Sequence, residues 1–318
     1  MLHRFWLTFH EESLEKRFQV EFDDWGVIVD KLILIFTVFL RIAILTKLWL
    51  AEVDTQAFYA TLVVSIPVLL EFLGRKYFEK HSPELLKDWR TTLVCASRYY
   101  MSVFFGRCIP YWLDVAARHP TATLGPWYPA LFHFASSGIP LRFALAFGLP
   151  LKFSHHLPLQ LFTAISTTIL TKKHYCGFIA APKMEKATAA IFTGCDFVSE
   201  FAWDAEDATE ASQLSGDRDY IGPCSCVRLL VFTNLFWGVC IASYLWWNVE
   251  FRMRINFLRK HGLDNNAELT GLVKVMSLFP WIIATFALPV FAILWRGTGS
   301  IANTIGAFGI VEEASWFE

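Results

Sequence analysis

Long apolar runs, separated by short charged blocks, dominate the pattern of hydrophobic and polar positions along the chain. A helix needs about 20 apolar residues to cross a bilayer core about 30 Å thick, so each long run is a candidate membrane span. The candidate spans are 25–50, 57–74, 91–111, 127–150, 157–181, 227–249 and 272–295. The run over 157–181 is the weakest, because Lys172 and Lys173 interrupt it. The pattern predicts an all-α fold, a polytopic helical membrane bundle of about seven transmembrane helices.

The first 24 residues have a different pattern, that of an amphipathic helix. Phe5 and Phe9 recur at helical spacing, and so do Phe18 and Phe22, while the opposite face is acidic. We expect residues 1–24 to form an interfacial helix on the membrane surface. Packing against the protein's own cytosolic loops is the alternative, since membrane-surface helices usually carry Lys and Arg. The segment lacks the apolar core of a cleavable signal peptide, so the first span is expected to act as the targeting signal.

Basic residues in the connections predict the topology, because cytoplasmic loops are enriched in Lys and Arg. They gather in the connections 75–90 and 250–271. These two connections share a side only if 127–150 and 157–181 both cross the membrane or neither does, and both runs are long enough to cross. We therefore expect a cytoplasmic N-terminus and a C-terminus outside the cell or in a lumen. The long acidic loop 182–226 then lies outside as well.

Composition supports a membrane protein and argues against a nucleic-acid partner. Hydrophobic residues make up 55% of the 318 residues and charged residues only 18%, whereas a soluble domain has about 25% charged residues. The formal net charge is −1, without the basic excess that nucleic-acid binding requires. No repeat or linker divides the sequence, so we expect residues 1–318 to form a single integral membrane domain.

Most signatures of catalysis are missing from the sequence. There is no P-loop, HExxH, GxSxG or EF-hand motif. The nine His form no HxxxH or HxxHH pattern of the kind that a membrane metal centre needs. We therefore expect no metal and no cofactor, and the chain is less consistent with an enzyme than with a non-catalytic protein.

Two arginines inside candidate spans are the most informative polar residues. Charge at the bilayer centre costs at least about 2.5–3.5 kcal/mol, so Arg98 and Arg142 should face the bundle interior or a watery cavity. They are expected at similar depth. Their anion is expected to be Glu71 of the second run, a lipid phosphate or a transported anion. The structural alternative is that each arginine pairs with a carboxylate or with backbone carbonyl groups.

Histidines provide weaker candidates. His133 lies inside a candidate span, where an imidazole can hydrogen-bond a neighbouring helix or take part in a proton relay or ligand site. His155 and His156 lie at an expected cytosolic helix end, where solvated imidazoles are the simplest interpretation.

Four of the seven cysteines, Cys176, Cys195, Cys224 and Cys226, lie in or beside the long acidic loop. An oxidising compartment would allow disulfides there. A bond between Cys224 and Cys226 would close a very tight ring, so the pairings that join the fifth span to the sixth are preferred. Free thiols are the main alternative, and zinc binding is less favoured because no His lies near Cys224 in sequence.

These features lead to three hypotheses of function. The first is a transporter or channel for an anionic solute, with Arg98 and Arg142 along the path and His133 and Glu71 as further candidates. The second is a non-catalytic receptor, scaffold or assembly factor. The third is a membrane-embedded enzyme that modifies lipid, with His133, His155 or His156 as acid or base. The expected partners are the lipid bilayer and a small anionic solute or lipid phosphate.

Overall fold

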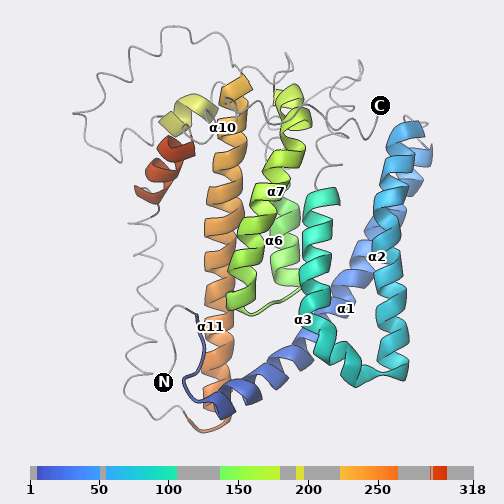
Figure 1. Ribbon diagram of the computed structural model, residues 1–318, viewed down its shortest axis with the longest axis vertical. Helices are drawn as coiled ribbons and strands as arrows, with labels where there is room; N and C mark the ends of the chain where they lie inside the picture. Colours follow the sequence, from blue (N-terminus) through green and yellow to red (C-terminus); the bar gives the residue numbers. More distant parts are fainter. Residues whose placement is uncertain are drawn as a thin grey trace.

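The computed structural model describes residues 6–50, 55–105, 137–179, 191–196, 223–263, 287 and 289–298. Within these ranges the fold is all-helical and contains no strand, as the pattern predicted. The main elements are α1 (Glu12–Leu50), α2 (Thr55–His81), α3 (Pro83–Tyr100), η1 (Met101–Phe105), α6 (Ile139–Gly148), α7 (Phe153–Ile179), α10 (Pro223–Thr233), η3 (Asn234–Ile241) and α11 (Ala242–Lys260). The π-helical segments η1 and η3 continue α3 and α10 without a break, so α10, η3 and α11 form one long rod (Figure 1).

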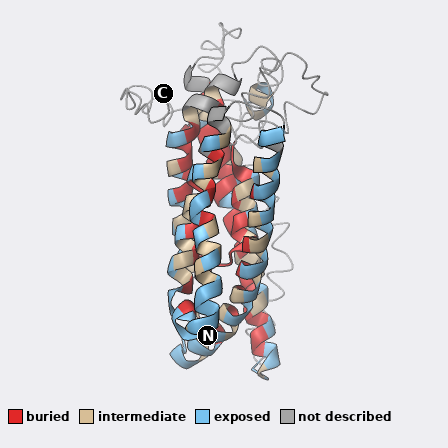
Figure 2. Ribbon diagram, turned by 90° about the vertical axis from the view of Figure 1, so that its right-hand side faces the viewer, coloured by how far each residue is buried: buried red, intermediate tan, exposed pale blue. Residues whose placement is uncertain are grey.

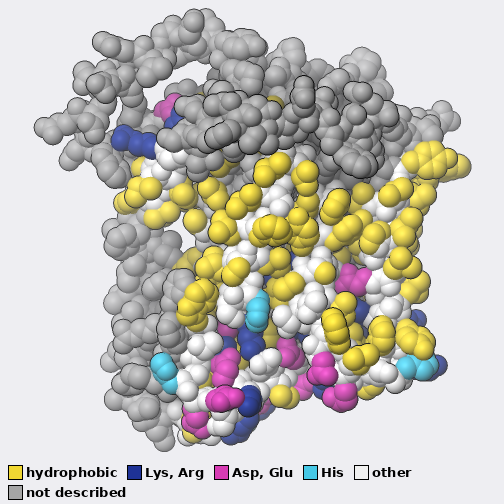
Figure 3. All heavy atoms as spheres, in the orientation of Figure 1, with side chains coloured by type: hydrophobic (Ala, Val, Ile, Leu, Met, Phe, Trp, Pro, Cys, Tyr) yellow, Lys and Arg dark blue, Asp and Glu magenta, His cyan; other side chains and the backbone are white. Residues whose placement is uncertain are grey.

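The helices stand side by side and alternate in direction along the chain (Figure 1). The α2–α3 junction and the C-terminal end of α11 consequently lie at the same end of the bundle, together with the first turns of α1. We call this the charged end, because Lys, Arg, Asp and Glu side chains gather there (Figure 3). The basic connections 75–90 and 250–271 thus begin at one end of the bundle, as the topology prediction requires. The side of a membrane that this end faces stays a prediction.

Residues 6–24, the described part of the segment expected to form a surface helix, do not form a separate helix. Residues from Glu12 onward are the first part of α1, which continues unbroken to Leu50. The aromatic face of this part is covered by protein, because Phe9, Phe18 and Phe22 are buried in a cluster. The other buried members of that cluster are Phe153, Trp246, Phe257 and Leu258. Packing on the end of α11, the alternative interpretation, accounts for the amphipathic pattern.

The outer faces of α1 and α2 are apolar and exposed. Their exposed side chains, each between 43% and 67% exposed, include Leu32, Phe36, Phe39 and Leu40 on α1, and Val63, Ile66, Leu70 and Leu73 on α2. Exposed residues follow the outward side of these two helices, while buried residues lie behind them (Figure 2). Above the charged end, apolar side chains dominate the described part of the surface (Figure 3).

Within the described residues, one helical stretch, Cys226–Lys260, is long and apolar enough to cross a membrane, and Ile139–Gly148 is a shorter apolar helix. The expected seven spans therefore stay a prediction. Part of the span expected at 127–150 and most of that at 272–295 lie outside the described residues, as does nearly all of the acidic loop 182–226.

Candidate functional site

A line of polar side chains runs along the buried face of α7. His156, Gln160, Thr163, Thr167 and Thr171 follow one another at intervals of three or four residues, which places them on one side of the helix. Each of these side chains is at most 3% exposed. Of this stripe, the sequence singled out only His156, although the helical spacing of the other four side chains is readable in it. The stripe gives the interior of the bundle a polar wall.

Arg98 of α3 faces this wall. Arg98 is 2% exposed, and its Nη2 lies 3.1 Å from Nδ1 of His156 and donates to Oε1 of Gln160 at 3.3 Å. Nη1 of Arg98 and Nε2 of His156 are both buried without a hydrogen-bond partner. Among the described residues Arg98 forms no ion pair. A buried cation with an unused N–H group thus lies beside a buried imidazole.

Arg142 of α6 occupies the neighbouring part of the interior. It is 1% exposed, and Nη2 donates to the backbone carbonyl of Ser137 at 3.2 Å and to Oδ1 of Asn234. Asn234 in turn donates to the hydroxyl of Thr168 at 2.7 Å. Nε and Nη1 of Arg142 are buried without a partner. In the part of the chain that the structure describes, Arg142 also has no carboxylate within ion-pair distance.

Gln160 connects the two arginines. Its side-chain oxygen accepts from Arg98, and its amide nitrogen donates to the carbonyl of Gly238 at 2.7 Å. Gly238 lies against the guanidinium of Arg142, since a Cβ at this position would be 2.9 Å from Cζ of Arg142. The two arginines predicted from sequence are therefore members of one buried polar layer shared by α3, α6, α7 and η3.

Both π-helical segments border this layer. Arg98 lies three residues before η1, and η3 begins at Asn234 and contains Gly238. Widening a helical turn displaces backbone carbonyl groups from their usual partners, and such segments occur frequently at functional sites. Here the widened turns of η3 present both the Asn234 side chain and the Gly238 carbonyl to the interior.

The remaining predicted site residues are placed elsewhere. Glu71 does not reach either interior arginine: it accepts from Arg75 at 2.7 Å and from the hydroxyl of Ser97. The expectation that Glu71 neutralises Arg98 or Arg142 is therefore wrong in this structure. His133 lies outside the described residues.

A third arginine inside the helices is also buried. Arg41 is 2% exposed and lies between α1 and α2. It donates to the carbonyl of Val64 at 3.1 Å and to the hydroxyl of Ser65 at 3.2 Å.

The cysteines are divided between a disulfide and free thiols. Cys176 at the end of α7 is bonded to Cys226 in α10, with their Cα atoms 5.5 Å apart. This is one of the bridges expected between the fifth and sixth spans. Cys195 carries a free thiol, and the side chain of Cys224 lies outside the described residues.

Carboxylates are plentiful at the charged end, where they neutralise other arginines. Arg90 of α3 pairs with Asp30 and Asp23 of α1, each at 3.0 Å. Arg254 of α11 pairs with Glu15 at 2.6 Å and with Glu250 at 2.9 Å. Burial raises the pKa of Glu15, but hydrogen bonds from Arg254 and the Phe9 backbone outweigh it, so the net pKa lies below its ordinary value. These fully paired arginines contrast with Arg98 and Arg142.

The described histidines do not form an acid–base pair with a carboxylate in the interior. His156 contacts Arg98, and His261 contacts Glu21 at the charged end at 2.8 Å. No group of three or more His, Cys, Asp or Glu that could hold a metal is present among the described residues. The interior layer therefore contains cationic N–H groups that have no hydrogen-bond acceptor in the described part of the chain.

Comparison with known proteins yields no relative. No family model, no curated protein and no solved structure matches the chain.

Proposed function

We propose that this chain is a multi-pass membrane protein that binds an anionic solute in its interior and moves it across the bilayer, with Arg98 and Arg142 contacting the anion. The observation that carries the proposal is the pair of buried guanidinium groups with three unused N–H nitrogens and no ion pair among the described residues. Burying a charge is costly unless it is paired and hydrogen-bonded. A bound anion supplies both the missing charge and the missing acceptors.

The surface of α1 and α2 supports the membrane part of the proposal. Soluble monomers rarely expose contiguous apolar patches larger than a few hundred Å². Many large apolar side chains on these two helices are substantially exposed, and lipid is the solvent in which such a surface is stable. Arg41 lies on α1 among these exposed side chains, but its guanidinium donates to Val64 and Ser65 of α2.

The α7 stripe supports the transport part. It begins at His156, in the first turn of α7, and continues to Thr171, about two turns before the end of that helix. Thr163 and Thr171 hydroxyl groups bond back to their own helix, at 2.6 Å and 2.7 Å, whereas the buried hydroxyl of Thr167 has no partner. A solute that leaves the arginine layer would meet hydroxyl groups along this face instead of hydrocarbon.

A second candidate function is a non-catalytic membrane protein in which the arginines only hold the bundle together. The observation in its favour is that each guanidinium already donates to neutral acceptors, Gln160 for Arg98 and Asn234 for Arg142. In that case, substitution of either arginine lowers the stability of the protein but changes the flux of no solute.

Anion flux from proteoliposomes distinguishes the two candidates. Vesicles containing the purified protein are loaded with one of several anions, such as chloride, nitrate, phosphate or a small carboxylate, and efflux is followed for each. Arg98→Gln and Arg142→Gln are expected to lower the flux of the transported anion about tenfold or more, because a hydrogen bond to a charged group contributes about 1.5–3 kcal/mol. Arg259→Gln, which removes an exposed arginine at the charged end, is the control. Absence of flux for every anion with the intact protein contradicts transport.

A further inference from the structure

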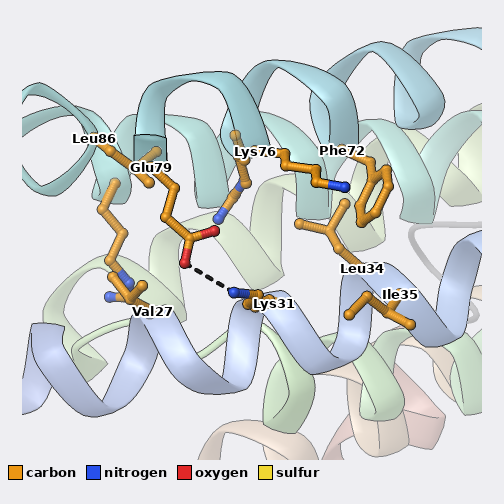
Figure 4. Close-up of a pocket in the computed structure, with 10 residues that line it drawn as sticks. Val27, Lys31, Leu34, Ile35, Phe72, Lys76, Glu79 and Leu86 are labelled. Carbon is orange, nitrogen blue, oxygen red and sulfur yellow. Dashed lines mark hydrogen bonds and ion pairs between the residues drawn. The ribbon is translucent and has the colours of Figure 1, made fainter. Parts of the chain in front are cut away.

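A groove between α1, α2 and α3 is lined by neither Arg98 nor Arg142, and its residues are shown in Figure 4. Its volume is about 180 Å³. Val27, Leu34, Ile35 and Phe72 form its apolar wall. Lys31, Lys76 and Glu79 provide charged groups along its length. The groove is therefore amphipathic, with charge and hydrocarbon side by side.

The charges of the groove are not equally available to a ligand. Arg75 and Arg90 also line it, but both are occupied by carboxylates: Asp30 and Glu71 pair with Arg75, and Asp30 and Asp23 pair with Arg90. Lys31 pairs with Glu79 at 2.8 Å, and both side chains are about half exposed. An exposed pair of this kind contributes only about 0–1 kcal/mol, so an anion can displace the carboxylate.

Lys76 is the cation that the groove leaves available. It is exposed and forms no ion pair among the described residues. Figure 4 shows its side chain extending along the groove towards Phe72, while Lys31 rises from the opposite helix towards Glu79. A flexible four-carbon stem lets each lysine amine follow a ligand along the groove.

The groove lies where the apolar exterior of the bundle meets the charged end. Leu32 on α1 and Leu73 on α2, beside the groove, belong to the exposed apolar surface. One turn nearer the charged end, Lys80 and Glu79 are exposed and charged. In a membrane this is the level at which acyl chains give way to headgroups, and basic pockets between helices at this level bind phospholipid headgroups.

We propose that the groove binds one glycerophospholipid, with its phosphodiester held by Lys76 and Lys31 and an acyl chain against Leu34, Ile35 and Phe72. The proposal rests on the membrane location in the proposed function, but not on anion transport. The match is one of charge and polarity: a phosphodiester complements the lysine amines, and the adjoining wall is hydrocarbon. Neither Arg98 nor Arg142 takes part in this site.

Native mass spectrometry of the detergent-purified protein tests the site. Phosphatidylglycerol and phosphatidylcholine, which share the phosphodiester, are titrated beside diacylglycerol, which lacks it. Both phospholipids are expected to bind more tightly than diacylglycerol. Lys76→Gln should weaken phospholipid binding about fivefold, since one lysine near the surface contributes about 1 kcal/mol. Lys80→Gln, the same change one turn along α2 and outside the groove, should leave binding unchanged.

The outcomes separate this proposal from the proposed function. Each of three results overturns the lipid site: diacylglycerol binds as tightly as the phospholipids, Lys76→Gln binds phospholipid as tightly as the intact protein, or Lys80→Gln loses as much affinity as Lys76→Gln. A second variant, Ile35→Trp, fills the apolar half of the groove and should weaken all three lipids; unchanged binding also overturns the site. Arg98→Gln should retain phospholipid, so a failure of anion flux contradicts transport alone. Recovery of the protein in a soluble fraction without detergent overturns the membrane location on which both proposals rest.

Discussion

The guanidinium group of Arg142 lies directly against the α-carbon of Gly238. A Cβ at this position would be 2.9 Å from Cζ and 3.0 Å from both terminal nitrogens of the arginine. Glycine is therefore the residue that lets η3 approach α6 closely enough for Asn234 to accept from Arg142. The close approach also brings the Gly238 carbonyl within 2.7 Å of the Gln160 amide.

Gly238→Ala is accordingly expected to displace Arg142 and lower the stability of the purified protein by about 1–3 kcal/mol, the usual cost of overpacking. The measurement is thermal unfolding in detergent. Gly74→Ala is the matched control, because a Cβ at Gly74 meets nothing within 4 Å. That control should be neutral or slightly stabilising, since alanine favours helix. Equal destabilisation by the two changes contradicts the contact.

Asn234→Asp tests whether Arg142 is held available for an anion. The new carboxylate would pair with the guanidinium, so the site should keep its fold but lose binding of the transported anion, measured as flux from proteoliposomes. Asn248→Asp makes the same change further along the same rod, where the amide donates to the Tyr244 carbonyl. Flux should survive in that control. Full flux in Asn234→Asp is incompatible with a role for Arg142 in the path.

The contact between the first turns of α1 and the end of α11 should weaken in acid. Burial raises the pKa of Glu15. Arg254, the Phe9 backbone and Lys152 together lower this pKa by more than burial raises it, so the net pKa falls below the ordinary value of 4.5. A carboxyl whose folded pKa is depressed stabilises the fold above its unfolded pKa, and this stabilisation is lost as pH falls through the folded pKa.

Hydrogen exchange of residues 12–25 measures this effect. Protection should be constant from neutral pH to about 4.5 and fall below it. Glu15→Gln should reduce protection at neutral pH and flatten the acid response. Glu12→Gln is the control, because Glu12 pairs only with exposed Lys16. A flat profile in the intact protein contradicts a role for Glu15 in holding the first turns of α1 against α11.

Reduction of the Cys176–Cys226 bridge should destabilise the protein. The bridge joins residues 50 positions apart, and the chain-entropy model assigns about 4 kcal/mol to a loop of that length. Cys176→Ser and Cys226→Ser should each cause the loss, whereas Cys195→Ser, at a free thiol, should not. Alkylation of the non-reduced protein followed by mass spectrometry identifies the bridge directly. Alkylated Cys176 and Cys226 in that sample would show that it does not form.

Single-cysteine labelling tests the topology. On a cysteine-less background, Ser82→Cys at the α2–α3 junction and Asn265→Cys beyond α11 should both label from the cytosolic side, because the basic connections 75–90 and 250–271 are expected there. Labelling from opposite sides contradicts the antiparallel arrangement of seven spans.

The sequence by itself determined the helical class and the buried position of two arginines. In hydrocarbon, the backbone N–H and C=O groups of an isolated segment must hydrogen-bond within that segment. Long apolar runs therefore predict α-helices. The free-energy cost of charge in hydrocarbon singled out Arg98 and Arg142 as inward-facing, and both are buried in the structure. Residue spacing also determined the amphipathic character of the first 24 positions, although the surface that covers their aromatic face was misjudged.

Tertiary structure alone decided which groups meet. Glu71 was a candidate partner for the interior arginines, yet it pairs with Arg75 one turn away on α2, because residues four apart face each other on one helix. The contacts of Arg98 with His156 and Gln160 join positions about 60 residues apart. Such contacts depend on how α3 and α7 are rotated about their axes, which side-chain packing determines and which no local pattern in the sequence encodes.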